Sequence, residues 1–324
     1  MSKIASKFFG NMKKILVFAA VLLIASTISA QSTFEFLRLD TSPRAAALAG
    51  SFVSDGDDPN VIFYNPAGIN LLSGMPVSFS FLKHLMDINS ASLSFSKNFE
   101  NIGRLAAGIQ YINYGTFTKA DASGTKLGEF GAGEMALLIG YGNQLDQNFY
   151  YGANLKFIYS SIAGEASTGL AVDLGLHYAI PELRWNFGFS VLNLGTQLSS
   201  YFSTKEDLPL DIRLGFSKEL ERVPFRFFWS FNKLNENKDN FFNRFNQITF
   251  GGEFRLGQSL RLRLGFDNEK RKELKIGTSA GLAGFSVGLG FIVNKYNVDY
   301  SFSSMGSIGS LHRIGISTNL DTFK

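Results

Sequence analysis

The stretch SLRLRLGFD, residues 259–267, alternates apolar and polar side chains without a break. In an extended strand, successive side chains point to opposite faces, so Leu260, Leu262, Leu264 and Phe266 share one face. The other face carries Ser259, Arg261, Arg263, Gly265 and Asp267. A barrel strand in a membrane turns its apolar face to lipid, where an arginine costs about 2–4 kcal/mol at the midplane. The stretch therefore predicts lumen-facing arginines.

The same alternation recurs from residue 77 to residue 320 and predicts fourteen strands. We place them at 77–83, 89–97, 104–114, 132–143, 148–160, 168–179, 185–194, 209–219, 225–234, 246–256, 259–268, 283–293, 296–303 and 311–320. Spans of ~9–11 residues suit tilted strands that cross a bilayer. The sequence therefore predicts an all-β, fourteen-stranded antiparallel transmembrane β-barrel.

The connections support this prediction because their lengths alternate. Short links follow the even-numbered strands, whereas longer loops at 115–131, 161–167, 195–208, 235–245, 269–282 and 304–310 follow the odd-numbered ones. Outer-membrane barrels have short periplasmic turns and longer outer loops. The alternative is a soluble β-sandwich, whose apolar faces would meet in a core.

The first thirty residues have the features of a secretory signal peptide. Lys3, Lys7, Lys13 and Lys14 precede the apolar run 15–25, and small residues end the segment at Ala30. The whole chain has 31 basic and 27 acidic residues. Without the four lysines of this segment, 27 basic residues balance 27 acidic ones, so the charge indicates no nucleic-acid partner. The chain contains no cysteine.

Residues 31–76 lack the alternation and are predicted to fold into the lumen as a plug. A lumen of this width is not filled by wall side chains alone. Within the segment, Asp55, Asp57 and Asp58 form an acidic turn. We expect this turn to pair with lumenal arginines, namely Arg213, Arg226, Arg261, Arg263 and Arg313. The alternative is that these arginines are merely hydrated.

The plug sequence carries a resemblance to a known family. The order FLRLDTSPRAAALAG (36–50), DDPN (57–60) and NPAGI (65–69), followed by fourteen strands, resembles the PorV/PorQ family of Bacteroidota outer-membrane barrels. Segments such as GLAVDLGLHY (169–178) and LPLDIRLGFSKEL (208–220) are similar to the PorQ pattern. That family is related in architecture to FadL-type fatty-acid transporters. The resemblance implies a FadL-like barrel in the outer membrane that serves type IX secretion.

Two functions are compatible with these features. The resemblance implies a non-catalytic protein that holds surface partners, PorZ-like and PorU-like, through its outer loops. Candidate aromatic anchors in those loops are Tyr201, Phe202, Phe241, Phe242 and Phe245, which an aromatic membrane belt would equally explain. The alternative is a FadL-like channel for small hydrophobic molecules, with residues 31–76 as its gate. A continuous apolar pocket would favour the channel, whereas a plugged polar lumen would favour the platform.

Catalytic, cofactor and metal sites are not indicated. The match GFSVG (284–288) to the serine-hydrolase motif places Ser286 in a regular strand, whereas that motif needs a strand-to-helix turn. The three histidines, His84, His177 and His312, lack ligand spacing. The position twelve counted from Asp55 is Pro66 and not the glutamate of a calcium-binding EF-hand. We therefore expect no enzyme, no cofactor and no metal.

Overall fold

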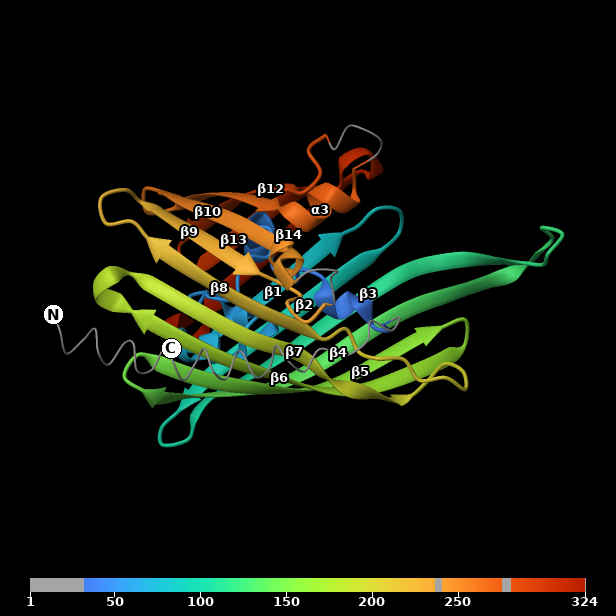
Figure 1. Cartoon of the computed structure of the whole chain (residues 1–324), viewed down its shortest axis with the longest axis horizontal. Coiled ribbons are helices and arrows are strands. Elements are labelled where there is room, and N and C mark those ends of the chain that lie inside the picture. The colour runs from blue at the N-terminus through green and yellow to red at the C-terminus, as the bar shows by residue number, and fades with distance from the viewer. Residues whose placement is uncertain (1–31, 237–240, 276–280, 324) are drawn as a thin grey trace.

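The computed structural model describes residues 32–236, 241–275 and 281–323. Fourteen antiparallel strands form one closed barrel, in which each strand pairs with its sequence neighbours and β1 pairs with β14 (Figure 1). The strands are β1 Pro76–Lys83, β2 Asn89–Phe99, β3 Gly103–Ala120, β4 Lys126–Asp146, β5 Phe149–Ile162, β6 Glu165–Ile180, β7 Trp185–Ser199, β8 Asp211–Glu219, β9 Phe225–Phe231, β10 Ile248–Leu256, β11 Leu260–Asp267, β12 Phe285–Val293, β13 Tyr296–Ser304 and β14 Ser310–Asn319. The predicted fold class is confirmed. The expected signal segment, 1–30, lies outside the described residues.

Strand β11 shows the alternation that the sequence predicted. Leu264 is 50% exposed on the outer face, whereas Arg263 is 4% exposed and points into the lumen. Arg263 lies opposite Glu253 of β10 and Gly288 of β12. An apolar outer face and a charged inner face are the reverse of a soluble barrel with an apolar core, and this arrangement is typical of strands that face lipid.

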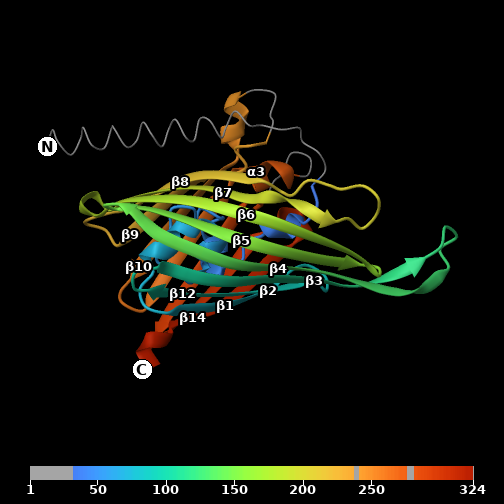
Figure 2. The same cartoon turned by 90° about the horizontal axis from the view of Figure 1, so that it is seen from below.

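One predicted loop is a protruding ribbon. Residues 115–131 were expected as a loop, but β3 and β4 stay paired from Thr116↔Gly131 to Ala120↔Lys126 and leave only 121–125 as the turn. Figures 1 and 2 show this ribbon extending far past the other strands. Its residues include Thr116, Thr118 and Lys119, so it lacks the continuous apolar row of the wall. The strands continue outward through backbone hydrogen bonds, which an alternating pattern of apolar side chains does not reveal.

The predicted loop 161–167 is also wrong. Strands β5 and β6 remain paired as far as Ile162↔Glu165, so the connection is the two-residue turn Ala163-Gly164. Both residues have positive φ, 54° and 90°. Two successive residues of that kind make the tight hairpin turn that matches strand twist. The short turns after even-numbered strands were predicted correctly, as at 147–148, 257–259 and 294–295.

Residues 32–75 lie inside the barrel, as the blue segment of Figures 1 and 2 shows. This plug consists of short helices and turns. The helices are η1 Glu35–Arg38, α2 Pro43–Ala47, η2 Pro59–Phe63 and η3 Pro66–Leu71. The plug begins beside the β7–β8 connection, where Thr33 N donates to Asp207 O at 3.0 Å, and it ends at β1. It therefore runs along the lumen from the longer-loop end to the short-turn end.

Inward-facing glycines let the plug backbone approach the wall. A Cβ atom added to Gly265 would lie 2.5 Å from Ala49 N, and one added to Gly152 would lie 2.5 Å from Pro66 C. Real Cβ atoms do not approach other atoms so closely. Glycines of the wall in this situation are Gly152, Gly175, Gly188, Gly251, Gly265 and Gly288. The abundance of glycine in the strands thus serves plug packing.

Candidate functional site in the plugged lumen

Arg44 is the centre of a buried ionic cluster between plug and wall. Its helix α2 starts at Pro43, and the Ser42 side chain accepts from Ala45 N at the helix N-terminus. The guanidinium of Arg44 lies 3.3 Å from the Asp55 carboxylate and 2.6 Å from that of Asp57. Its Nε lies 3.0 Å from Glu253 of β10. One cation therefore joins two parts of the plug to the barrel.

The acidic turn holds a second arginine from the wall. Arg226 of β9 lies 3.1 Å from the Asp55 carboxylate and 3.2 Å from that of Asp57. Asp58 serves locally, because its carboxylate accepts from Asn60 N at 2.8 Å and caps helix η2. Hydrogen-bonded partners offset the cost of burying these charges. The turn is thus fixed between Arg44 and Arg226.

Burial and the two arginines push the acidic pKa values apart. Burial raises the pKa of Asp55 to about 8, against the attraction of Arg44. Burial also opposes ionisation of Asp57, but Arg44 and Arg226 hold its pKa well below the ordinary value. The Asp57 side chain is 51% exposed, because it lines a cavity of the lumen. Asp57 therefore carries the negative charge while Asp55 binds a proton readily.

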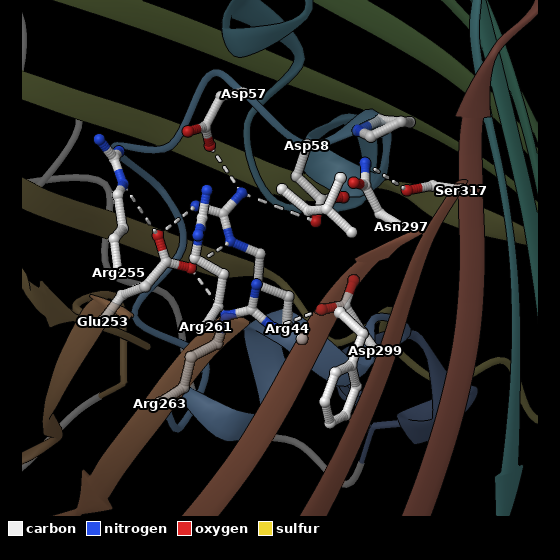
Figure 3. Close-up of a pocket in the computed structure, with 14 residues that line it drawn as sticks. Arg44, Asp57, Asp58, Glu253, Arg255, Arg261, Arg263, Asn297, Asp299 and Ser317 are labelled. Atoms are coloured by element: carbon white, nitrogen blue, oxygen red, sulfur yellow. Dashed lines mark hydrogen bonds and ion pairs between the residues drawn. The ribbon is translucent and has the colours of Figure 1, made fainter. Parts of the chain in front are cut away.

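A polar cavity of about 240 Å³ lies beside this cluster. Figure 3 shows the residues that line it. Arg263 extends into it from β11, lies 2.7 Å from Glu253, and also bonds Asp299 of β13. The labelled residues around it are Arg44, Asp57, Asp58, Glu253, Arg255, Arg261, Arg263, Asn297, Asp299 and Ser317. The cavity lies near the short-turn end of β10 to β14 and is lined by alternating charges.

Of the five predicted arginines, the structure brings only Arg226 into contact with the acidic turn. Arg213 instead bonds Asp211 at 2.6 Å, because these residues are two apart on the same inner face of β8. Arg313 donates to Asp40 O and to Ser303. Arg263 bonds Glu253 and Asp299, as described above. Arg261 donates to the carbonyls of Gly257 and Leu260 at the end of its own strand.

Sequence reasoning missed Arg44 and Glu253. Arg44 stands in an alanine-rich run whose position relative to the wall has no sequence signal. Glu253 does have one, because it lies on the inward row of ITFGGEFRL (248–256) between outward Gly252 and Phe254. An acidic residue on a lumen-facing row, such as Glu253, indicates a contact with the plug as well as the predicted arginines do.

A second buried polar network connects the plug to the wall at β5, β6 and β7. Lys156 Nζ lies 2.9 Å from Asp173 and donates to Asn193 Oδ1 at 2.6 Å. Asn154 Nδ2 links this group to the plug by donating to Ile62 O at 2.8 Å. Asn193 has φ of 62° at a register shift of β6 and β7, which lets its N–H reach Asp173. These contacts anchor helix η2 to β5 and β6.

On the side of β3 to β6, the plug packs against the barrel through an apolar cluster. Phe34 and Phe36 of the plug are 3% and 2% exposed and pack in one cluster with inward-facing wall residues. The wall residues of this cluster include Ile112, Leu138 and Ile158, with Leu208 of the β7–β8 connection. The lumen therefore combines an apolar cluster beside β3 to β6 with an ionic cluster beside β9 to β13, and neither of the two expected arrangements is complete.

The five predicted rim aromatics differ in their surroundings. Phe202 is 78% exposed, whereas Tyr201 turns back and donates its hydroxyl to Ser160. Phe245 packs edge-on against Phe231 at 5.5 Å between ring centres. The side chains of Phe241 and Phe242 lie outside the described residues. Among the three whose side chains the structure describes, Phe202 is the most exposed, and Phe245 is 36% exposed.

The structure places the serine-hydrolase motif as expected, with Ser286 inside strand β12. Within residues 32–236, 241–275 and 281–323, no three His, Asp or Glu side chains are arranged to hold a metal ion. Over the same ranges, no helix has the length and apolar character required to cross a bilayer.

Comparison with solved structures identifies the fold. The Ralstonia pickettii toluene transporter TbuX aligns with a TM-score of 0.57 and 11% identity over 85% of this chain and 96% of its own. A Pseudomonas aeruginosa FadL homologue aligns at 0.56 with 9% identity, covering 86% and 98%. The Pseudomonas putida toluene transporter TodX aligns at 0.56 with 11% identity, again covering 86% and 98%. The chain thus has the fold of FadL-type outer-membrane barrels.

The sequence itself matches no family profile and no curated protein. The resemblance to the PorV/PorQ family therefore stays a prediction.

Proposed function

We propose that this protein is an outer-membrane channel for small hydrophobic molecules, closed by its own residues 32–75. The apolar cluster that the plug forms with β3 to β6 carries the proposal, because most wide outer-membrane lumens are polar. Burying a phenylalanine side chain contributes about 1.5–3 kcal/mol. A hydrophobic molecule that enters the outer end can replace Phe34 and Phe36 against Ile112 and Ile158 and recover a similar free energy. The toluene transporters of the same fold support this substrate class.

The ionic cluster around Arg44 makes the plug a gate. A hydrophobic molecule cannot pass Arg44, Glu253 and Arg226 while they are paired, because exposing buried charges to it costs several kcal/mol. Passage therefore requires the plug to shift away from β9 and β10. Residues 51 and 249 report that shift, since Ser51 Oγ and Thr249 Oγ1 are only 2.7 Å apart.

A disulfide lock between positions 51 and 249 tests the gate. The chain has no cysteine, so Ser51→Cys with Thr249→Cys introduces the only thiols, in place of two hydroxyl groups that lie in direct contact. Intact cells that produce the oxidised variant should lose uptake of a radiolabelled aromatic hydrocarbon, and reduction should restore it. Ser51→Cys alone is the matched control. Uptake that is equal in the oxidised and reduced double variant contradicts a gated channel.

A second candidate is the platform for surface attachment that the PorV/PorQ resemblance implies. The ribbon of β3 and β4 favours it, because it extends a paired surface well past the barrel (Figure 2). The ionic cluster around Arg44 also favours it, because this cluster holds the plug in place and a platform needs no open lumen. Its partners would be PorZ-like and PorU-like proteins of type IX secretion.

Deletions separate the two candidates. Removing 116–130 or 235–245 should release the surface partner from a platform, as measured by co-purification from outer membranes. The disulfide lock between positions 51 and 249 should leave that attachment intact. If both deletion variants retain the surface partner, the platform function is contradicted. Loss of hydrocarbon uptake in the locked form supports the channel.

A further inference from the structure

The outer wall has a hollow of about 830 Å³ at the base of the β3–β4 ribbon. Phe81, Ala91 and Tyr111 line it from β1, β2 and β3, and Asp87 lines it from the β1–β2 connection. Asn113 and Gly133 are among the residues that line it on the side of the ribbon. Binding sites for small molecules commonly enclose about 300–1,000 Å³.

Register explains why the wall is recessed here. Ala91 pairs with Phe81 on one side and with Tyr111 on the other, so a methyl group lies between two rings on the outward row. Gly133 pairs with Asn113 in the next position. Directly beyond, the pairing shifts between Asn113 and Thr116, and Gly115 has φ of 81°. The small side chains of Ala91 and Gly133 thus create the hollow, and the register shift between β3 and β4 lies where the ribbon begins.

The hollow changes from apolar to polar along its length. Phe81 and Tyr111 belong to the outward rows that continue along β1 and β3 with Phe79 and Ile109, which are 48% and 39% exposed. Asp87 and Asn113 lie at the other end, toward the connecting loop and the ribbon. A recess on the lipid-facing surface cannot stay filled with water at its apolar end. A molecule that binds in the hollow must therefore be apolar at one end and polar at the other.

We propose that this hollow binds an uncharged amphiphile, with its chain along Phe81 and Tyr111 and a hydroxyl-bearing head group beside Asp87 and Asn113. The charge of the lining selects the head group. Asp87 is the single charged residue among the lining residues, and no lysine or arginine lines the hollow. A carboxylate or phosphate would lie near the like-charged Asp87 carboxylate, with no cation in the lining to pair with it, and like charges repel each other. Hydroxyl groups instead donate to the carboxylate and the amide oxygen.

The site goes beyond the proposed channel. It lies on the outside of β1 to β4, whereas the gate lies between the plug and β9 and β10. An experiment that contradicts the binding site on the outer wall therefore leaves the proposed gate untouched, and the reverse is also true.

Photolabelling tests the site on the full chain in nanodiscs. The probe is a monoacylglycerol with a diazirine in its chain, and mass spectrometry locates the adducts. We expect adducts concentrated in 81–91 and 111–116. Ala91→Trp fills the recess and should reduce them about tenfold, the effect of ~1.4 kcal/mol. Ala107→Trp is the matched control, since Ala107 is a lipid-facing alanine of the wall that lies outside the hollow.

The head group has its own comparison. A diazirine fatty acid of equal chain length should label the hollow weakly in the native protein and more strongly in Asp87→Asn, because the substitution removes the opposing charge. Heat-modifiable migration in gels confirms that each variant is folded. Adducts spread evenly over the outer wall, equal labelling of the two tryptophan variants, or equal labelling by acid and ester in the native protein each overturn the proposal.

Discussion

Replacing Arg44 by methionine is the most direct test of the ionic cluster that holds the plug. The guanidinium lies within 4.0 Å of four carboxylates, those of Asp55, Asp57, Asp58 and Glu253. Methionine keeps much of the length and apolar contact of the side chain but removes the charge. Removing one partner of a buried ion pair costs about 3–5 kcal/mol, because the other charge stays buried. The docked plug loses that free energy.

Such a loss changes the population of the undocked plug by a large factor. Every 1.4 kcal/mol is a factor of ten, so we expect an increase of about 10²- to 10⁴-fold. In planar bilayers the native protein should conduct rarely, and Arg44→Met should show frequent openings. Arg184→Met is the control, because Arg184 is 46% exposed and lies 3.8 Å from Glu219. An exposed pair contributes at most about 1 kcal/mol. Equal conductance of Arg44→Met and the native protein refutes the reasoning.

Three further predictions concern the same contacts. Asp57→Arg with Asp58→Arg places like charge beside Arg44 and should raise ion conductance; unchanged conductance would mean that the acidic turn does not hold the plug. Burial raises the pKa of Asp55 to about 8, so the docked plug keeps that proton while an undocked Asp55 loses it near pH ~3.9. Docking therefore weakens as pH rises through this window, and the rise in conductance from pH 5 to 8 should shrink in Asp55→Asn. Gly175→Leu removes the space into which the plug packs and should open the channel, whereas a closed Gly175→Leu channel would contradict the close approach of plug and wall.

The strands were predictable because lipid and lumen impose opposite chemistry on alternate residues. Where that constraint ends, prediction failed. The ribbon mixes apolar and polar residues on its faces, as with Phe117 and Lys119, so its backbone pairing has no regular side-chain pattern. The tight turn at Ala163 and Gly164 was not predicted, because alanine seldom adopts the positive φ that Ala163 has.

The candidate site was predictable in kind but not in its pairings. Charge alone matched Asp57 with Arg226, but it did not distinguish Arg226 from Arg213, whose partner Asp211 is two residues away on the same row. Arg44 remained hidden because the path of the plug through the lumen is set by tertiary packing against inward glycines. Local pattern does not encode that path.

The central claim is that lipid covers the apolar rows while the charged rows face a lumen closed by the plug. Single nitroxide labels on Leu264→Cys and Arg263→Cys test it directly, since the chain has no other cysteine. In bilayers, the label at 264 should relax strongly with oxygen, which dissolves in lipid, and the label at 263 should not. A label at 263 that is as accessible to oxygen as the label at 264, or the reverse order, contradicts the account.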